Sequence, residues 1–263
     1  MSFNYGGYSH VGYKRETNQD FMDCKPFGEN ILLAIVSDGK GSEPSKLQPA
    51  QIAARQITST IERIYDKGVN EKYIIDNASI ILKEAVMSVN NTLGAFKTAN
   101  EEIYSGFTCA LTCVLFTRDE EKNYHISFAH CGNTRLYLIR KGKDDNAVIR
   151  QLTTDQTEAQ KILEAGQISE EQYYMIPERN KLLCPLGAYS EPTVVTFDGK
   201  VAANCIFLLT TDGIHYAIRP EAIASLVLEN PNFDDACKTL SDAAISLQYN
   251  DDNASLLIRC NND

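Results

Sequence analysis

Two short apolar runs in this chain end in the same way, and together they constrain its fold more than any other feature. Ile31–Val36 leads through Ser37 into Asp38-Gly39, and Phe207–Leu209 leads through two threonines into Asp212-Gly213. Each run is too short for a typical helix and is rich in strand-forming residues. Each therefore predicts a buried strand that delivers an aspartate.

A third acidic position has the reverse polarity, because Asp252 stands before the apolar run Ala254–Ile258 rather than after it. We expect the carboxylates of Asp38, Asp212 and Asp252 to meet at one sheet edge. A single Asp-Gly pair is more often a bend than a ligand, so the prediction depends on the conjunction of the three.

Carboxylates that gather away from bulk water repel one another and lose hydration, unless protons or cations neutralise them. Oxygen ligands without a clustered histidine set or a Cys-x-x-Cys pair favour magnesium or manganese over zinc or copper. A glycine after the aspartate lets a main-chain carbonyl approach a cation closely, which makes Gly39 a further candidate ligand. The sequence thus predicts a site for divalent metal ions.

The order of the predicted elements is strand, two helices, several strands, two helices and a last strand. Apolar residues at helical spacing predict helices at 49–64, 73–93, 159–165, 220–228 and 233–247. Further strands are predicted at 107–116, 124–130, 135–139, 193–197, 205–210 and 255–258, with 107–139 forming an antiparallel meander. This order is typical of an α+β protein whose helices pack outside paired sheets. No linker tract interrupts residues 1–263, which predicts a single domain.

The charge balance excludes one class of function. Twenty-five Lys and Arg against 35 Asp and Glu give a formal net charge of −10, the wrong sign for binding nucleic-acid phosphates along a broad face. No apolar run is long enough to predict a membrane span, and the first residues lack the pattern of a secretory signal, so we expect a cytoplasmic protein. The eight scattered cysteines are predicted to be reduced core thiols.

Eight short motifs, individually weak, occur along the chain in one order. They are Arg15-Glu16-Thr17-Asn18-Gln19-Asp20, Asp38-Gly39, Ser105-Gly106-Phe107-Thr108, Gly132-Asn133-Thr134-Arg135, Leu152-Thr153-Thr154-Asp155, Leu186-Gly187, Thr211-Asp212-Gly213 and Asp252-Asn253. In this arrangement the chain resembles the metal-dependent protein serine/threonine phosphatases of type 2C, especially the compact bacterial form, over nearly its whole length.

The resemblance implies an antiparallel β-sandwich flanked on both sides by helix pairs, in four αββα layers, with a flap around 155–180 that borders the cleft. It also implies two divalent ions, Mn or Mg, and a water between them that attacks a phosphomonoester in line. Carried over by position, Asp38 would bridge both ions, Asp212 and Asp252 would complete one of them, and the Gly39 carbonyl would bind the other. Asp20 would support this site directly or through water.

Two basic residues are candidates for contact with the substrate phosphate. Arg15 holds the motif position of a phosphate clamp, because a guanidinium offers a bidentate fork to two phosphoryl oxygens; its alternative is a solvated surface arginine. Lys40 stands where bacterial relatives often have Met, and it either faces the substrate phosphate or lies solvated over the loop. The kinetics of Lys40→Met would distinguish these two alternatives.

Asn133 departs from the family pattern, which usually has there an aspartate that holds a weakly bound third metal. An amide is a poorer ligand for a hard cation than a carboxylate, so we expect a binuclear site whose third ion is weak or absent. His130-Cys131 resembles the start of a cysteine-phosphatase loop, but Arg135 follows the cysteine too closely for that geometry. We expect Cys131 and His130 to be packed in the core.

The predicted function is that of a hydrolase that removes phosphate from phosphoserine and phosphothreonine in proteins, in signal transduction. The resemblance implies a phosphorylated protein as substrate and a Ser/Thr kinase as the functional opposite. The alternative from another class is a catalytically weak, phosphatase-like module that binds a phosphoprotein or signalling partner, which Asn133 favours slightly. A small-molecule phosphatase with the same chemistry stays open as a third hypothesis.

Overall fold

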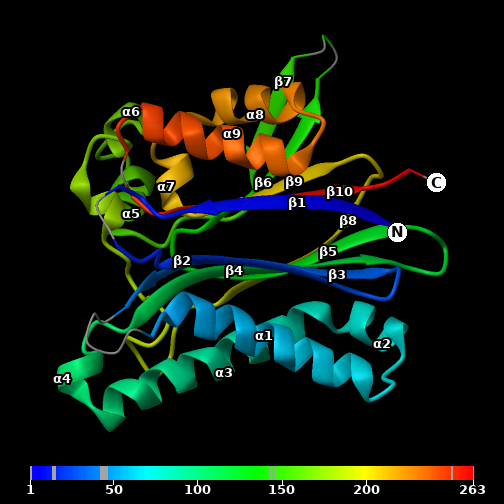
Figure 1. Ribbon diagram of the computed structural model, residues 1–263, viewed down its shortest axis with the longest axis horizontal. Coiled ribbons are helices and arrows are strands. Elements are labelled where there is room, and N and C mark those ends of the chain that lie inside the picture. Colours follow the sequence, from blue (N-terminus) through cyan, green and yellow to red (C-terminus); the bar gives the residue numbers. More distant parts are fainter. Residues whose placement is uncertain are drawn as a thin grey trace.

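Two antiparallel sheets lie face to face in the computed structural model, which describes residues 2–13, 16–41, 47–142, 144, 146–249 and 251–262 (Figure 1). Sheet A has the strand order β1 (Phe3–His10), β10 (Asn253–Cys260), β9 (Ile206–Thr210), β6 (Arg135–Lys141) and β7 (Ala147–Gln151). Sheet B has the order β2 (Asp20–Phe27), β3 (Ile31–Lys40), β4 (Thr108–Arg118), β5 (Tyr124–Cys131) and β8 (Val195–Val201).

Helices cover the outer face of each sheet, which confirms the predicted α+β sandwich in four layers. Sheet B is covered by α1 (Pro49–Asp66) and α3 (Ala78–Ala99), with the short helices α2 (Glu71–Asp76) and α4 (Glu101–Tyr104) beside them. Sheet A is covered by α8 (Pro220–Glu229) and α9 (Phe233–Ser246). The remaining helices, α5 (Glu158–Glu164), α6 (Glu170–Tyr173), the 3₁₀ turn η2 (Pro177–Asn180) and α7 (Asp212–His215), gather at one end of the sandwich.

The continuous apolar runs arise because the strands in the middle of the sandwich are buried on both faces. In β3, Leu33 and Ile35 pack with the helices outside sheet B, whereas Leu32, Ala34 and Val36 fill the space between the sheets. A strand with two buried faces has no polar alternation, which is why the sequence shows a run instead of a period of two. The runs that predicted β3, β9 and β10 therefore mark the centre of the fold.

The predicted antiparallel meander over 107–139 is wrong at its third strand. β4 and β5 pair with each other in sheet B, but β6 crosses to sheet A, where it lies between β9 and β7. The crossing occurs at Gly132, whose φ of 107° lies in the left-handed region, and a Cβ there would stand 2.4 Å from that of Ala110. This conformation, which favours glycine, turns the chain out of sheet B instead of back along β5.

Other element boundaries also differ from the sequence patterns. The helix predicted over 73–93 is two helices, because the main-chain and side-chain amides of Asn77 both bind the Tyr73 carbonyl, at 3.1 and 2.9 Å, where α2 ends. The strands β1, β2 and β7 were not predicted. β1 contains two adjacent glycines and β2 contains Pro26, so neither shows an apolar run.

Candidate active site

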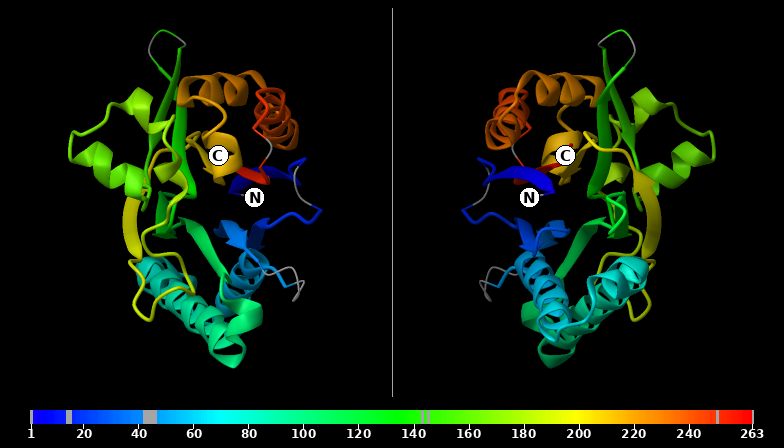
Figure 2. Two further views of the ribbon diagram at one scale, coloured as in Figure 1. Left: turned by 90° about the vertical axis from the view of Figure 1, so that its left-hand side faces the viewer. Right: turned by 90° about the vertical axis from the view of Figure 1, so that its right-hand side faces the viewer.

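Acidic residues from four separate parts of the chain come together at the end of the sandwich that carries the short helices. Asp20 begins β2 and lies directly opposite Asp38 of β3 in the antiparallel register. Asp212 is the first residue of α7, which follows β9, and Asp252 immediately precedes β10. Sheet B thus supplies two of the carboxylates, and the strands of sheet A lead to the other two. Figure 2, left, looks onto this end, with the yellow-green flap helices beside the gold helix α7.

A close backbone contact joins the two acidic segments of sheet A. A Cβ added to Gly213 would lie 2.0 Å from the carbonyl oxygen of Asp252 and 2.9 Å from the Cβ of Asn253. No side chain fits in that space, so glycine is required after Asp212 for the segment that bears Asp252 to lie against it. From the sequence, a ligand role was predicted only for Gly39, and the structure shows that Gly213 is needed for packing.

The Asp252 carboxylate is fixed by the N-terminal part of the chain. Its two oxygens accept hydrogen bonds from the main-chain amides of Gly12, at 3.0 Å, and Gln19, at 2.8 Å, and the residue is only 2% exposed. Its neighbour Asp251 is half-buried, and its charge raises the pKa of both Asp20 and Asp212. Both members of the acidic pair therefore act on the site, and Asp252 as the metal ligand stays a prediction.

Burial and mutual repulsion make Asp20 and Asp212 costly to ionise. Loss of hydration raises the pKa of Asp20 well above its usual value, and the charges of Asp212 and Asp252 raise it further. Loss of hydration likewise raises the pKa of Asp212, followed by the charges of Asp38 and Asp251. A divalent cation at this point would offset both effects, because it favours the ionised form of each carboxyl group.

Several buried polar atoms at this end, in the part of the chain that the structure describes, lack a hydrogen-bond partner, and together they suit a hard cation and its bound water. Among the described residues, Asp20 Oδ2, Asn133 Oδ1 and both amide atoms of Asn253 are buried without a hydrogen-bond partner. Within the same residues, no three His, Cys, Asp or Glu side chains are close enough to hold an ion alone. Mg²⁺ usually keeps several waters and takes only one or two carboxylates, so an open set of oxygen donors suits it.

The structure places the remaining predicted site residues as follows. Gly39 lies at the same end of β3, where a Cβ would stand 2.8 Å from the Gln19 carbonyl oxygen and 3.0 Å from Ala50. Lys40 is exposed, and its stem passes over Gly106, with Cε 3.6 Å from where a Cβ there would be. Asn133 is buried and donates a 3.1 Å hydrogen bond from Nδ2 to Asp212 Oδ2. Arg15, the predicted phosphate clamp, lies outside the described residues.

An ion pair that sequence reasoning missed lies beneath the flap. Arg135 donates two hydrogen bonds of 2.8 Å to the two carboxylate oxygens of Asp155, and each residue is 3% exposed. Burial by itself would raise the pKa of Asp155, but the adjacent guanidinium lowers it to about 2. Both residues stood in recognised motifs, yet nothing in those motifs showed that they pair with each other.

The same carboxylate connects the flap to the helix that carries Asp212. Asp155 Oδ2 accepts a 2.6 Å hydrogen bond from the Tyr173 hydroxyl in α6 and a 3.2 Å one from the Tyr216 hydroxyl, which follows α7. The Tyr216 hydroxyl also lies 2.8 Å from the carbonyl oxygen of Arg179, whose guanidinium is 4.6 Å from the centre of the Tyr216 ring. The flap is therefore attached to the acidic end through α7.

His130 and Cys131 lie in the core, as predicted. The His130 ring is fully buried, with Nδ1 2.9 Å from the Thr112 hydroxyl and Nε2 3.1 Å from the Thr154 carbonyl. Loss of hydration lowers the pKa of His130, which keeps the ring neutral. The Cys131 thiol is also buried and donates to the Cys184 carbonyl at 3.2 Å.

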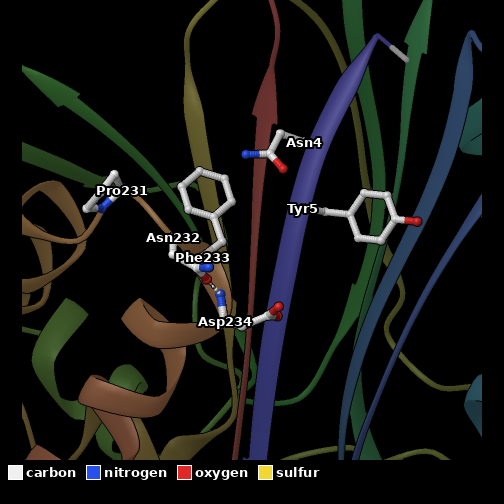
Figure 3. Close-up of a pocket in the computed structure, with 6 residues that line it drawn as sticks. All are labelled: Asn4, Tyr5, Pro231, Asn232, Phe233 and Asp234. Carbon is white, nitrogen blue, oxygen red and sulfur yellow. Dashed lines mark hydrogen bonds between the residues drawn. The ribbon is translucent and has the colours of Figure 1, made fainter.

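A hollow of about 430 Å³ lies away from the carboxylates, at the N-terminal end of α9 (Figure 3). It is lined by Asn4, Tyr5, Pro231, Asn232, Phe233 and Asp234. The Asn232 side chain caps α9 and Asp234 accepts a 2.9 Å hydrogen bond from the Gly7 amide, so both polar groups already have protein partners. The buried aspartates Asp20, Asp212 and Asp252 do not line this hollow.

Comparison with known proteins gives one family and several bacterial relatives. The family model for protein phosphatase 2C matches residues 6–244. The serine/threonine protein phosphatase PstP of Mycobacterium tuberculosis is 23% identical over 247 residues, which cover 93% of this chain and 42% of PstP. The serine/threonine phosphatase stp of Listeria monocytogenes is 24% identical over 89% of this chain and 83% of its own length. This chain thus spans about two fifths of PstP but most of the Listeria protein.

Solved structures share the fold. The crystal structure of M. tuberculosis PstP superimposes with a TM-score of 0.81 at 21% identity, covering 100% of both chains. The catalytic domain of PstP in complex with two manganese ions gives a TM-score of 0.78 at 20% identity, covering 99% of both chains.

The raised pKa values of Asp20 and Asp212 generate a stability prediction. In chelator, Asp212→Asn should raise the melting temperature, because it removes a buried charge that repels its neighbours. Manganese at about a hundredfold excess over its dissociation constant should stabilise the unchanged protein by about 2.7 kcal/mol and the variant much less. Thermal unfolding with chelator and with manganese measures both effects. Asp198→Asn, on exposed β8, is the control, and a variant that behaves like this control would contradict the prediction.

The buried pair generates a second prediction. Asp155→Asn should lower the free energy of unfolding by about 3–5 kcal/mol, because it leaves the Arg135 charge buried without a counter-charge. The folded-state pKa of Asp155, about 2, lies below its usual 3.8, so this carboxylate stabilises the fold fully above pH 4 and progressively less as the pH falls through 2. Urea unfolding against Asp242→Asn, which breaks only an exposed pair with Lys238, measures the difference; equal losses would refute it.

Proposed function

The chain belongs to the protein phosphatase 2C family, and from this premise we propose that it is a metal-dependent hydrolase of phosphoserine and phosphothreonine in proteins. The observation that carries the proposal is the convergence of Asp20, Asp38, Asp212 and Asp252 at one end of the sandwich. Manganese in a PstP catalytic domain of the same fold supports divalent ions as the cofactor. The relatives PstP and stp are named serine/threonine phosphatases, which supports the class of substrate.

The proposed division of labour follows the position of each oxygen donor. Asp38 would be a ligand shared by two divalent ions, Asp212 and Asp252 would be further ligands of one of them, the Gly39 carbonyl would be a ligand of the other, and Asp20 would support the site directly or through water. When bound, the ions would lower the pKa of a water molecule and neutralise phosphate charge. The hydrogen bonds that Asp252 accepts from two main-chain amides hold its carboxylate in place for this role. The Gly213 contact keeps Asp212 beside it.

The substrate side of the site needs a positively charged side chain, because the surrounding carboxylates repel a phosphate dianion. Lys40 is exposed next to Gly39 at the end of β3, so its flexible stem can carry the ammonium group toward a phosphate near the acidic end. We assign to Arg15 the bidentate phosphate contact, on its motif position alone. Both assignments are part of the proposal.

A binding module without turnover is the less favoured alternative. A domain that only docks a phosphoprotein has no need for carboxylates whose burial and mutual repulsion disfavour ionisation, as at Asp20 and Asp212. Asn133 is the one feature that favours it, since its amide occupies a position where the family usually has a carboxylate. Retention of Asp38, Asp212 and Asp252 together favours the enzyme.

The proposal extends to cellular context. We place residues 1–263 as one phosphatase domain that acts in the cytoplasm on phosphorylated proteins, in signal transduction, and opposes a Ser/Thr kinase. Eight free cysteines suit a reducing compartment. No helix in the described part of the chain is long and apolar enough to cross a membrane. The acidic net charge disfavours nucleic acid as a partner.

Hydrolysis of a generic aryl phosphate, and then of a phosphothreonine peptide, tests the function. We expect a rate with manganese that chelator removes and that Asp38→Asn lowers by at least about a hundredfold, since the bridging ligand is lost. Asp198→Asn on β8 should retain the full rate. Tight binding of the phosphopeptide without turnover by the unchanged protein would instead support the binding module, and a rate on aryl phosphate but not on the peptide would support a small-molecule phosphatase.

Asn133 generates a prediction about the number of ions. The residue donates to Asp212 Oδ2, while its own Oδ1 has no partner among the described residues, so Asn133→Asp would turn a donor into a second carboxylate at this point. We expect calorimetric manganese titration of the variant to show an additional or tighter binding event, and the melting temperature in chelator to fall through like-charge repulsion. Equal manganese binding by both proteins would contradict a third-ion role for this position.

A further inference from the structure

Two cysteines face each other across neighbouring strands at the end of sheet A that is opposite the acidic end. In the antiparallel pairing of β9 with β10, Ile206 lies opposite Arg259, so the next residues outward, Cys205 and Cys260, are the next opposing pair. A main-chain hydrogen bond of 3.3 Å from the Cys260 amide to the Cys205 carbonyl confirms that the pairing continues to this point. Cross-strand neighbours in such a ladder have Cα atoms about 4.5–5.5 Å apart, within the range that a disulfide spans.

A β-bulge lies at this cysteine pair. The Cys260 carbonyl accepts a 2.7 Å hydrogen bond from the Asn204 amide, and Asn204 has a φ of 64°, in the left-handed region. Asn204 and Cys205 therefore both lie opposite Cys260, in the pattern of a bulge whose first residue is left-handed. An asparagine held in a conformation that favours glycine indicates that the local structure fixes this geometry.

The two thiols also point to the same side of the sheet. Cys260 is fully buried in the apolar core between the sheets, together with Phe3, and Cys205 packs against the same core while remaining half-buried. Burial raises the pKa of Cys260, and the charge of Cys205, when ionised, raises it further. Cys205 is thus partly exposed, and its cross-strand neighbour Cys260 is buried.

We propose that Cys205 and Cys260 are a redox modification site, which closes to a cross-strand disulfide on exposure to a low-molecular-weight disulfide. The Cys205 thiolate attacks one sulfur of the reagent and releases one reagent thiolate. The Cys260 thiol then loses its proton to solvent, and its sulfur displaces the second reagent thiolate from Cys205. The two protein thiols lose two electrons, and one reagent disulfide becomes two thiols.

The disulfide would join the two strands that lead to the carboxylates of Asp212 and Asp252, and it would not contact those carboxylates. β9 leads from Cys205 towards Asp212, and β10 leads from Asp252 to Cys260, so the cysteine pair lies roughly 25 Å from those aspartates at the strand rise per residue. A covalent tie there fixes the register of β9 against β10 and closes a long loop, which stabilises a fold chiefly by restricting the unfolded chain. Oxidation should therefore raise thermal stability and leave the acidic end in place.

The experiment treats the whole chain with glutathione disulfide, blocks the remaining thiols, and maps peptides without reduction. We expect one peptide pair, linked through Cys205 and Cys260, that is lighter than the sum of its reduced peptides by two hydrogen atoms, and a higher melting temperature reversed by dithiothreitol. Arg219 precedes Pro220 and resists trypsin, so a second cleavage after Glu221 is needed to separate Cys205 from Cys237. None of these readouts requires phosphatase activity.

Variants separate a specific link from general thiol oxidation. Cys205→Ala and Cys260→Ala should each abolish the linked peptide and the gain in melting temperature, and Cys260→Ala should accumulate the mixed disulfide at Cys205. Cys184→Ala, which removes another half-buried thiol, is the matched control and should form the link normally. A stable mixed disulfide at Cys205 with Cys260 still free in the unchanged protein, or links among other cysteines in place of this one, would overturn the proposal.

Discussion

Repulsion between carboxylates that share a poorly hydrated space is the constraint on which the rest of this structure depends. Asp20 and Asp212 are buried, and each is disfavoured as an anion by its acidic neighbours. The carboxylates stay together despite this repulsion because four well-packed strands hold the acidic segments in register, and because main-chain amides bind Asp252. This arrangement therefore strongly favours the binding of positive charge at one place on a molecule whose net charge is negative.

The flap depends on a second electrostatic arrangement, in which opposite charges are satisfied internally. Arg135 and Asp155 are paired and surrounded by the hydroxyl groups of Tyr137, Tyr173 and Tyr216, so no charge in this group needs a ligand. The two buried clusters therefore serve opposite purposes. The neutral cluster fixes the flap to α7, whereas the acidic residues of the negative cluster repel one another, so an added cation would stabilise it.

The sequence predicted a site residue best where its position depends on one strand alone. Asp38 and Asp212 follow runs that are apolar because the strand is buried on both faces, and such runs can be recognised without neighbours. Gly132 shows the limit, because a glycine turn does not reveal whether the next strand stays in its sheet or crosses to the other. The pairing of Arg135 with Asp155 was also beyond reach, since its burial depends on tyrosines from α6 and the end of α7.

The division of the carboxylates between the two sheets has a mechanical consequence. Asp20 and Asp38 belong to sheet B, whereas Asp212 and Asp252 adjoin strands of sheet A. Apolar side chains such as Val36, Phe207 and Leu256 fill the space between the layers, and the hydrogen bond from Gln19 to Asp252 joins the layers at the acidic end. Any slip of one layer over the other changes the distances within the acidic group. Substitutions deep in the core between the sheets should therefore alter the spacing of these carboxylates without touching them.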